Sequence, residues 1–191
     1  MIKIGKNISE FSMYSCQPKT NGELEQIIKD RISKEGPNCD LNDIDVSLIT
    51  DMSYLFMESP FNGDISNWNV SNVEKMSYMF AYSRFNGDIS EWDTSEVTDM
   101  GRMFEKSQFN GDISNWNTSK VKMMRDMFSY SKFNRDISKW NISNVTDMYA
   151  MFFESSFIGN ISNWKINKDC DTRHMFDWCL IKEKHKPVLQ R

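Results

Sequence analysis

Hydrophobic positions recur along this chain with a constant step of 24 residues. The recurring unit is F-N-G-D-I-S-x-W-x-x-S-x-V-x-x-M-x-x-M-F-x-x-S, and it runs from residue 40 to residue 176 without an insertion. A fixed period predicts that each unit forms one coil of the same shape and that equivalent residues stack in successive coils. The apolar columns are Phe56 to Phe176, Phe61 to Phe157, Ile65 to Ile161, Trp68 to Trp164 and Val73 to Val145.

Each unit predicts one short strand and one short helix. The polar–apolar–polar run at residues 64–66 is typical of a strand, and stacked copies predict a parallel sheet. Apolar residues between 73 and 80 have the spacing of a short helix. Asn62-Gly63 predicts a bend at positive φ, which these residue types adopt most easily. The pattern predicts an α/β solenoid with short parallel strands on one side and short helices on the other.

The segments that flank the repeat predict caps for the two ends of the stack. Before it, Thr20 and Glu23 match a capping box, and the apolar residues that follow predict an amphipathic helix ending at Gly36-Pro37. After it, residues 178–181 are expected to fold over the open end. We divide the chain into an N-terminal cap (1–39), a solenoid of about six units (40–176), and a C-terminal cap with a loose basic tail (177–191).

Composition narrows the function. An aromatic content of 13% is too high for a disordered chain, and the presence of only two alanines argues against a helical bundle. The net charge of -4 leaves no general basic surface, so we expect no nucleic-acid partner. The four cysteines contain no C-x-x-C pair and are expected to be free thiols. Because no stretch reaches ~18 apolar residues, we expect no membrane span.

The units at residues 61–83 and 85–107 closely resemble the BspA-like leucine-rich-repeat family, which is frequent in mycoplasma and other bacterial surface proteins. The resemblance covers about residues 40–176 and is most specific at Asp-Ile-Ser-x-Trp and Met-Phe. It implies a right-handed, arc-shaped leucine-rich-repeat solenoid with its sheet on the concave side, and a role in binding macromolecules. It also implies exposure at the cell surface. Residues 1–7, which lack an apolar run of signal-peptide length, instead predict a cytoplasmic protein.

A column of carboxylates runs beside the predicted strands, at Asp64, Asp88, Asp112 and Asp136. Like charges stacked about 5 Å apart repel unless something offsets them. We expect each carboxylate to accept hydrogen bonds from turn N–H groups or from the serine hydroxyl two residues later. The alternatives are a cation such as Ca²⁺ bridging the column, and recognition of a basic partner.

Catalysis has little support in the sequence. His174 and His185 are the only histidines, and no H-x-x-x-H, G-x-S-x-G or P-loop spacing occurs. His174 falls at an outward position of a predicted helix and is expected to be a solvated surface residue. Stacked ladders also leave little room for a substrate cavity. We therefore expect no enzymatic activity, no cofactor and no bound metal.

Positions that change between units predict where specificity lies. One such column lies beside the predicted strands, and a second, at Tyr82, Lys106, Tyr130 and Glu154, lies on the predicted helix side. We expect an unknown protein partner to bind the concave surface formed by Asp64, Asn67, Asp88, Glu91, Asp112, Asn115, Asp136 and Lys139. The alternative is a structural protein that forms homo-oligomers through its coils or edges.

Overall fold

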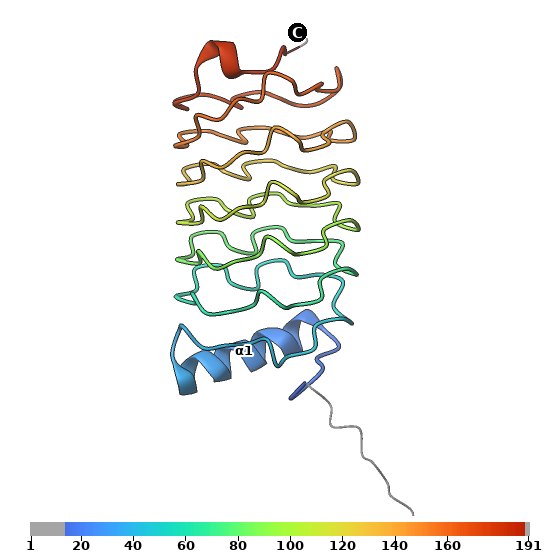
Figure 1. Ribbon diagram of the computed structural model, residues 1–191, viewed down its shortest axis with the longest axis vertical. Helices are drawn as coiled ribbons and strands as arrows, with labels where there is room; N and C mark the ends of the chain where they lie inside the picture. Colours follow the sequence, from blue (N-terminus) through green and yellow to red (C-terminus); the bar gives the residue numbers. More distant parts are fainter. Residues whose placement is uncertain (1–13, 190–191) are drawn as a thin grey trace, which may run out of the picture.

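The computed structural model describes residues 14–189 and is a column of stacked coils (Figure 1). The chain climbs coil by coil from α1, Asn21–Glu35, at one end to the 3-10 helix η1, Glu183–His185, at the other. These are the two named elements in the described part of the chain. Residues 1–7, on which the cytoplasmic prediction rests, lie outside the described residues, as does the end of the basic tail.

Helix α1 covers the first coil. The Thr20 hydroxyl accepts a hydrogen bond from the Glu23 N–H at 3.2 Å, and the Glu23 carboxylate accepts one from the Lys19 N–H at 2.7 Å. Leu24 and Ile28 are buried and belong to the same core as the coils. The helix therefore shields an apolar cross-section that would otherwise face water.

The predicted α/β solenoid, with parallel strands on one side and helices on the other, is wrong. Between residues 36 and 182 the chain forms turns and isolated parallel bridges, and none of these bridges extends into a strand. The concave sheet implied by a leucine-rich-repeat solenoid is therefore missing from the described residues. Most of the bridges form one column, through Asp51, Lys75, Asp99, Met123, Asp147 and Asp171.

Side-chain-capped turns replace the predicted strands. Oδ1 of Asp64 accepts a hydrogen bond from the Ser66 N–H at 2.9 Å, and equivalent bonds of 2.9–3.0 Å recur in the next three coils. A carboxylate that bonds the backbone two residues ahead folds the chain back instead of extending it. The polar–apolar–polar pattern at residues 64–66 therefore marks a turn.

Successive tight turns replace the predicted helices. Met79 donates its N–H to the Met76 carbonyl at 3.2 Å, whereas the next residue, Phe80, donates to Met103 in the following coil at 2.9 Å. An α-helix would direct each N–H to the carbonyl four residues back. Turns of this length place apolar side chains three residues apart, which is also a helical spacing, so the pattern could not separate the two structures.

Two columns of non-glycine residues have a left-handed backbone, with φ between 49° and 66°. This conformation costs roughly 1–2 kcal/mol for a residue with a Cβ atom. Hydrogen bonds between coils offset this cost. For example, the backbone N–H of Tyr82 donates to the backbone carbonyl of Glu105 at 2.7 Å. The first column is Tyr54, Tyr78, Arg102, Asp126, Ala150 and His174, and the second is Glu58, Tyr82, Lys106, Tyr130, Glu154 and Trp178.

The glycine after Asn62 has a different role from the one predicted. Among the described residues, Gly36 has a positive φ, whereas Gly63 does not. A Cβ atom at Gly63 would lie 1.9 Å from the Cys39 carbonyl oxygen, and one at Gly87 would lie 2.8 Å from the Phe85 ring. At Gly63 glycine is needed because the Cys39 backbone passes so close, whereas three coils later the equivalent position holds Arg135.

Aromatic columns form the core, which confirms that equivalent rings stack. The rings of Phe80 and Phe104 are 5.7 Å apart and nearly parallel, and those of Phe85 and Phe109 are 6.2 Å apart. Each tryptophan from Trp68 to Trp164 is 4% exposed and donates its indole N–H to a carbonyl of the preceding coil at 2.9–3.2 Å. These rings contribute both apolar area and a directional bond.

The indole bond gives the first prediction. Trp116→Phe removes the 3.0 Å indole bond from the buried Ile89 carbonyl and leaves it only the longer bond from the Trp92 N–H at 3.4 Å, which costs about 1–3 kcal/mol. The thermal midpoint, followed by circular dichroism, is expected to fall by roughly 2–10 °C. Trp178→Phe is the matched control, because Trp178 is 80% exposed, and it is expected to leave the midpoint unchanged. Equal midpoints for the two variants would contradict this role.

The left-handed columns give the second prediction. Glu58→Gly is expected to raise the thermal midpoint, because glycine removes a strain of roughly 1–2 kcal/mol while losing about 0.5–1 kcal/mol of backbone entropy. Glu74→Gly makes the same change at an exposed residue outside those columns and is expected to lower the midpoint. Shifts of the same sign in both variants would show that the strain is not significant.

Candidate functional site

The eight residues predicted to bind a partner are all exposed, and we call the surface they form the Asx face. The structure confirms that turn N–H groups offset the aspartate column. The backbone bond from Ser66 lowers the pKa of Asp64, and equivalent serine bonds lower the pKa of Asp112 and Asp136. In the next coil an uncharged residue, Asn160, accepts the same bond from Ser162 at 3.1 Å. The aspartates are therefore part of the turn framework.

Metal binding has no ready-made site. Across residues 14–189, no group of three or more His, Cys, Asp or Glu side chains is arranged to hold a metal ion. The calcium alternative for the aspartate column thus lacks the several oxygen ligands that such an ion requires.

A second surface carries the side chains of the two left-handed columns, and we call it the variable face. All six residues of the second column are exposed, and Tyr82 and Tyr130 expose 40% and 42% of their surface. The two columns present Tyr, Trp, Arg, Lys, His, Asp, Glu and Ala, whereas the core column beside them has Phe in every coil from Phe56 to Phe176. The backbone is constant and the side chains change.

The sequence predicts the variation at Tyr82 and its equivalents, but on a helix. For the column of His174 it predicts only that the side chains point outward from a helix. The structure pairs His174 Nδ1 with Asp177 Oδ2 at 2.7 Å on the exposed surface. The only sequence evidence for that column was that its residue type changes in nearly every unit.

Cations and aromatic rings alternate between coils on the variable face. Lys106 Nζ lies 5.1 Å from the ring centre of Tyr82 and 4.9 Å from that of Tyr130. The Arg125 guanidinium lies 4.0 Å from the ring centre of Tyr149, and that of Arg173 lies 5.7 Å from it. Cation–π contacts at exposed sites contribute about 0.5–1 kcal/mol each, so they favour these positions of the rings.

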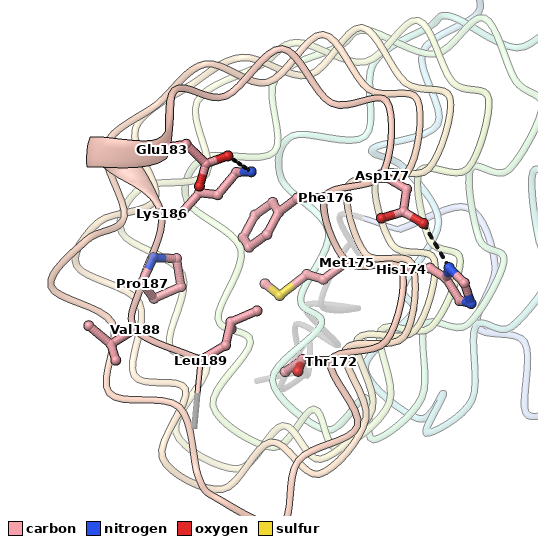
Figure 2. Close-up of a pocket in the computed structure, with 10 residues that line it drawn as sticks. All are labelled: Thr172, His174, Met175, Phe176, Asp177, Glu183, Lys186, Pro187, Val188 and Leu189. Carbon is pink, nitrogen blue, oxygen red and sulfur yellow. Dashed lines mark hydrogen bonds and ion pairs between the residues drawn. The ribbon is translucent and has the colours of Figure 1, made fainter. Parts of the chain in front are cut away.

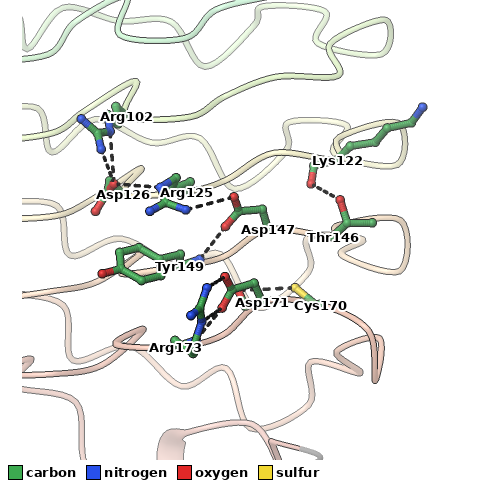
Figure 3. A network of polar contacts seen from close by, with 10 residues as sticks. All are labelled: Arg102, Lys122, Arg125, Asp126, Thr146, Asp147, Tyr149, Cys170, Asp171 and Arg173. Carbon is green, nitrogen blue, oxygen red and sulfur yellow. Dashed lines mark hydrogen bonds and ion pairs between the residues drawn. The ribbon is translucent and has the colours of Figure 1, made fainter.

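Ion pairs connect the same coils, as Figure 3 shows. Arg102 Nη2 lies 3.0 Å from Asp126 Oδ2, and Arg125 Nη1 lies 3.5 Å from Asp147 Oδ2. Burial raises the pKa of Asp126, although Arg102 and Arg125 oppose the increase. The carboxylate is only partly compensated by its neighbours.

A hollow of about 320 Å³ opens on the variable face among these groups. Residues of four coils line it, among them Arg102, Glu105, Asp126, Tyr130, Tyr149 and, at the rim, His174. Phe153 and Ala150 complete the wall beside Tyr149. Burial and the nearby Glu105 raise the pKa of Tyr82, whose hydroxyl donates to Glu105 Oε1 at 3.1 Å. The hollow combines aromatic walls with acidic groups.

A second hollow, of about 500 Å³, lies at the C-terminal end of the column (Figure 2). Phe176, the last ring of its column, stacks on Phe152 and has Lys186 Nζ 5.5 Å from its centre. The expectation that residues 178–181 fold over this end holds only in part, since Ile181 is 5% exposed but Trp178 is 80% exposed. The end of the stack remains partly open.

The comparisons with known proteins identify a family. Residues 24–130 and, in a second overlapping match, residues 83–186 fit the family described as "Mycoplasma protein of unknown function, DUF285". The chain belongs to this family. None of the curated proteins or solved structures compared with this DUF285 chain matches it. Within the described part of the DUF285 chain, neither helix combines the length and apolar character needed to cross a membrane.

The ion pair between Arg173 and Asp171 gives the third prediction. Hydrogen bonds from Arg173 lower the pKa of Asp171 from 3.8 to about 2. The ionised Asp171 carboxylate therefore stabilises the fold fully above the pKa that it has in the unfolded chain, and this stabilisation is lost as pH falls from about 4 toward 2. Asp171→Asn is expected to give a flatter decline of the urea midpoint over this range than the parent protein. Asp169→Asn, an exposed neighbour, is the control, and an identical decline in all three proteins would contradict the assignment.

Proposed function

We propose that this protein is a non-enzymatic binding module that recognises a protein partner through its variable face. The observation that carries the proposal is the constant left-handed backbone with changing side chains. Tyrosine, tryptophan and arginine supply most of the binding energy in protein interfaces, and rigid aromatic side chains lose little entropy when they bind. On this face the cation–π contacts already restrict those side chains.

The variable face is favoured over the Asx face because of how the polar atoms are used. On the Asx face, one oxygen of each aspartate supports a turn, and the same residue type recurs in four successive coils. Repeated framework groups carry little information about a partner. The changing residues of that face, Asn67, Glu91, Asn115 and Lys139, form the competing docking surface.

A relation to the BspA-like repeat proteins belongs to the same proposal. The shared Asp-Ile-Ser-x-Trp and Met-Phe elements support it, because in this chain they correspond to the turn, the buried tryptophan and the stacked phenylalanine. That relation would place the protein at the cell surface, and the alternative is the cytoplasm. Protease treatment of intact cells distinguishes the two locations.

End-to-end assembly into homo-oligomers is the second candidate. It is favoured by the open C-terminal end, where Trp178, Leu180 and Val188 are 80%, 67% and 81% exposed. Light scattering over a range of concentrations tests it. A monomer at every concentration would exclude assembly and leave the binding module.

Site-specific photocrosslinking tests the docking surface, and this is the fourth prediction. A photoreactive phenylalanine analogue at Tyr82 or Tyr130 is expected to give the same adduct, identified by mass spectrometry, in extracts of the source cells. The analogue at Asn67 or Asn115, which are equally exposed on the Asx face, is the matched control and is expected to give none. Adducts from the Asx positions alone would move the function to that face.

A further inference from the structure

Glu105 is a buried carboxylate with an unused oxygen. The residue is 9% exposed and lines the hollow on the variable face. Its Oε1 accepts a hydrogen bond from the Tyr82 hydroxyl, but its buried Oε2 has no hydrogen-bond partner in the described structure. The flanking guanidinium of Arg102 has its Nη1 4.0 Å from Oε2, which is beyond hydrogen-bond distance. A buried charged oxygen left in this state is costly, so it favours an arriving donor.

The lining of the hollow has an excess of negative charge. Its carboxylates are Glu105 and Asp126, and the one guanidinium in the lining is that of Arg102. Arg125, outside the lining, has its Nε 3.7 Å from Asp126 Oδ2 but is shared with Asp147. Arg102 contacts Oδ2 of Asp126, with its Nε 3.1 Å and its Nη2 3.0 Å from that oxygen. Figure 3 shows the other Asp126 oxygen outside this network. His174, at the rim, is already paired with Asp177. Two carboxylate oxygens are thus available to a cation.

Aromatic rings form the remaining walls. Tyr130 and Phe153 meet edge to face with their ring centres 5.4 Å apart, and Tyr149 comes from the neighbouring turn. Lys106 and Arg125 already lie over the rings of Tyr130 and Tyr149, at 4.9 and 4.0 Å from the ring centres. The rings therefore serve chiefly as apolar walls that exclude the water that would otherwise solvate the carboxylates. An anion would be repelled by Glu105 and Asp126, and a neutral apolar group would leave Glu105 Oε2 unpaired.

We propose that this hollow binds the cationic end of a lysine or arginine side chain of the protein partner. The inference rests on the proposed function and specifies the chemistry of the partner. The alkyl part of the side chain lies against the rings, and its N–H groups donate to Asp126 Oδ1 and Glu105 Oε2. Because Oε2 is covered in the free protein, binding includes the rotation of a side chain at the rim, a change common at interfaces.

Nuclear magnetic resonance titration tests the inference, with Nα-acetyl-lysine methylamide as the probe. Its neutral counterpart, Nα-acetyl-norleucine methylamide, has a similar alkyl chain. With the aromatic residues labelled, the lysine probe is expected to shift the signals of Tyr130, Tyr149 and Phe153 in a saturable way. The norleucine probe and acetate are expected not to do so. Equal shifts with norleucine, saturable binding of acetate, or no shift with lysine would each overturn the inference.

Variants test whether the Glu105 carboxylate itself, and not the overall negative charge of the protein, binds the lysine probe. Glu105→Gln keeps an acceptor for Tyr82 and is expected to weaken the lysine probe about tenfold or more. Glu91→Gln removes the same charge from the Asx face and is expected to leave the affinity unchanged. Ala150→Tyr fills the hollow without changing charge, and the same column already holds tyrosine at Tyr54 and Tyr78, so the variant is expected to fold and lose binding. Unaltered affinity in Glu105→Gln or in Ala150→Tyr would refute the site.

The two proposals fail in different ways. If the lysine probe does not bind but Tyr82 and Tyr130 still crosslink to one partner, the hollow is not the recognition site and the binding face stands. If the probe binds and no crosslinked partner is found, the hollow is a cation site and the proposed function fails.

Discussion

The contact between one coil and the next carries the whole structure. A single coil has no strand or helix to satisfy its own backbone, and it uses tight turns for only some of its N–H groups. Other N–H groups bond to a neighbouring coil, either the next one, as from Phe80 to Met103, or the preceding one, as from Thr98. The indoles bond to the preceding coil, and the phenylalanine rings stack in both directions. No unit can therefore bury its core or pair its backbone alone, so the helix at one end and the partly closed turn at the other are needed to finish the stack.

The 24-residue step was enough to predict stacking and the aromatic core, and the capping box of Thr20 and Glu23 predicted the helix that follows it. It was not enough to predict backbone conformation. Residues that face one core three positions apart fit an α-helix and a series of tight turns equally well, and the hydrogen bonds that separate them run to another coil. The same ambiguity affected residues 64–66, where a turn capped by Asp64 has the alternation of a strand. Gly63 indicated a special position but not whether φ or space required it.

The candidate site was predictable only in outline. Comparing units revealed that Tyr82 and its equivalents change, but the left-handed turns that expose them had no glycine to mark them. The hollow was hidden more completely, because its lining comes from residues of four units. Each of those residues, including Glu105, appears unremarkable in its own unit. Its properties arise from what the neighbouring coils place beside it, which a single repeat does not contain.

The left-handed columns also bear on how such a protein changes over generations. Each of these positions carries the same strain whatever L-residue occupies it, and its backbone bonds do not involve the side chain. In the second column, where all six side chains are exposed, exchanging one side chain for another is thus nearly neutral for folding. A duplicated unit would add one more coil with such a position, so new recognition surfaces can arise without redesign of the interior.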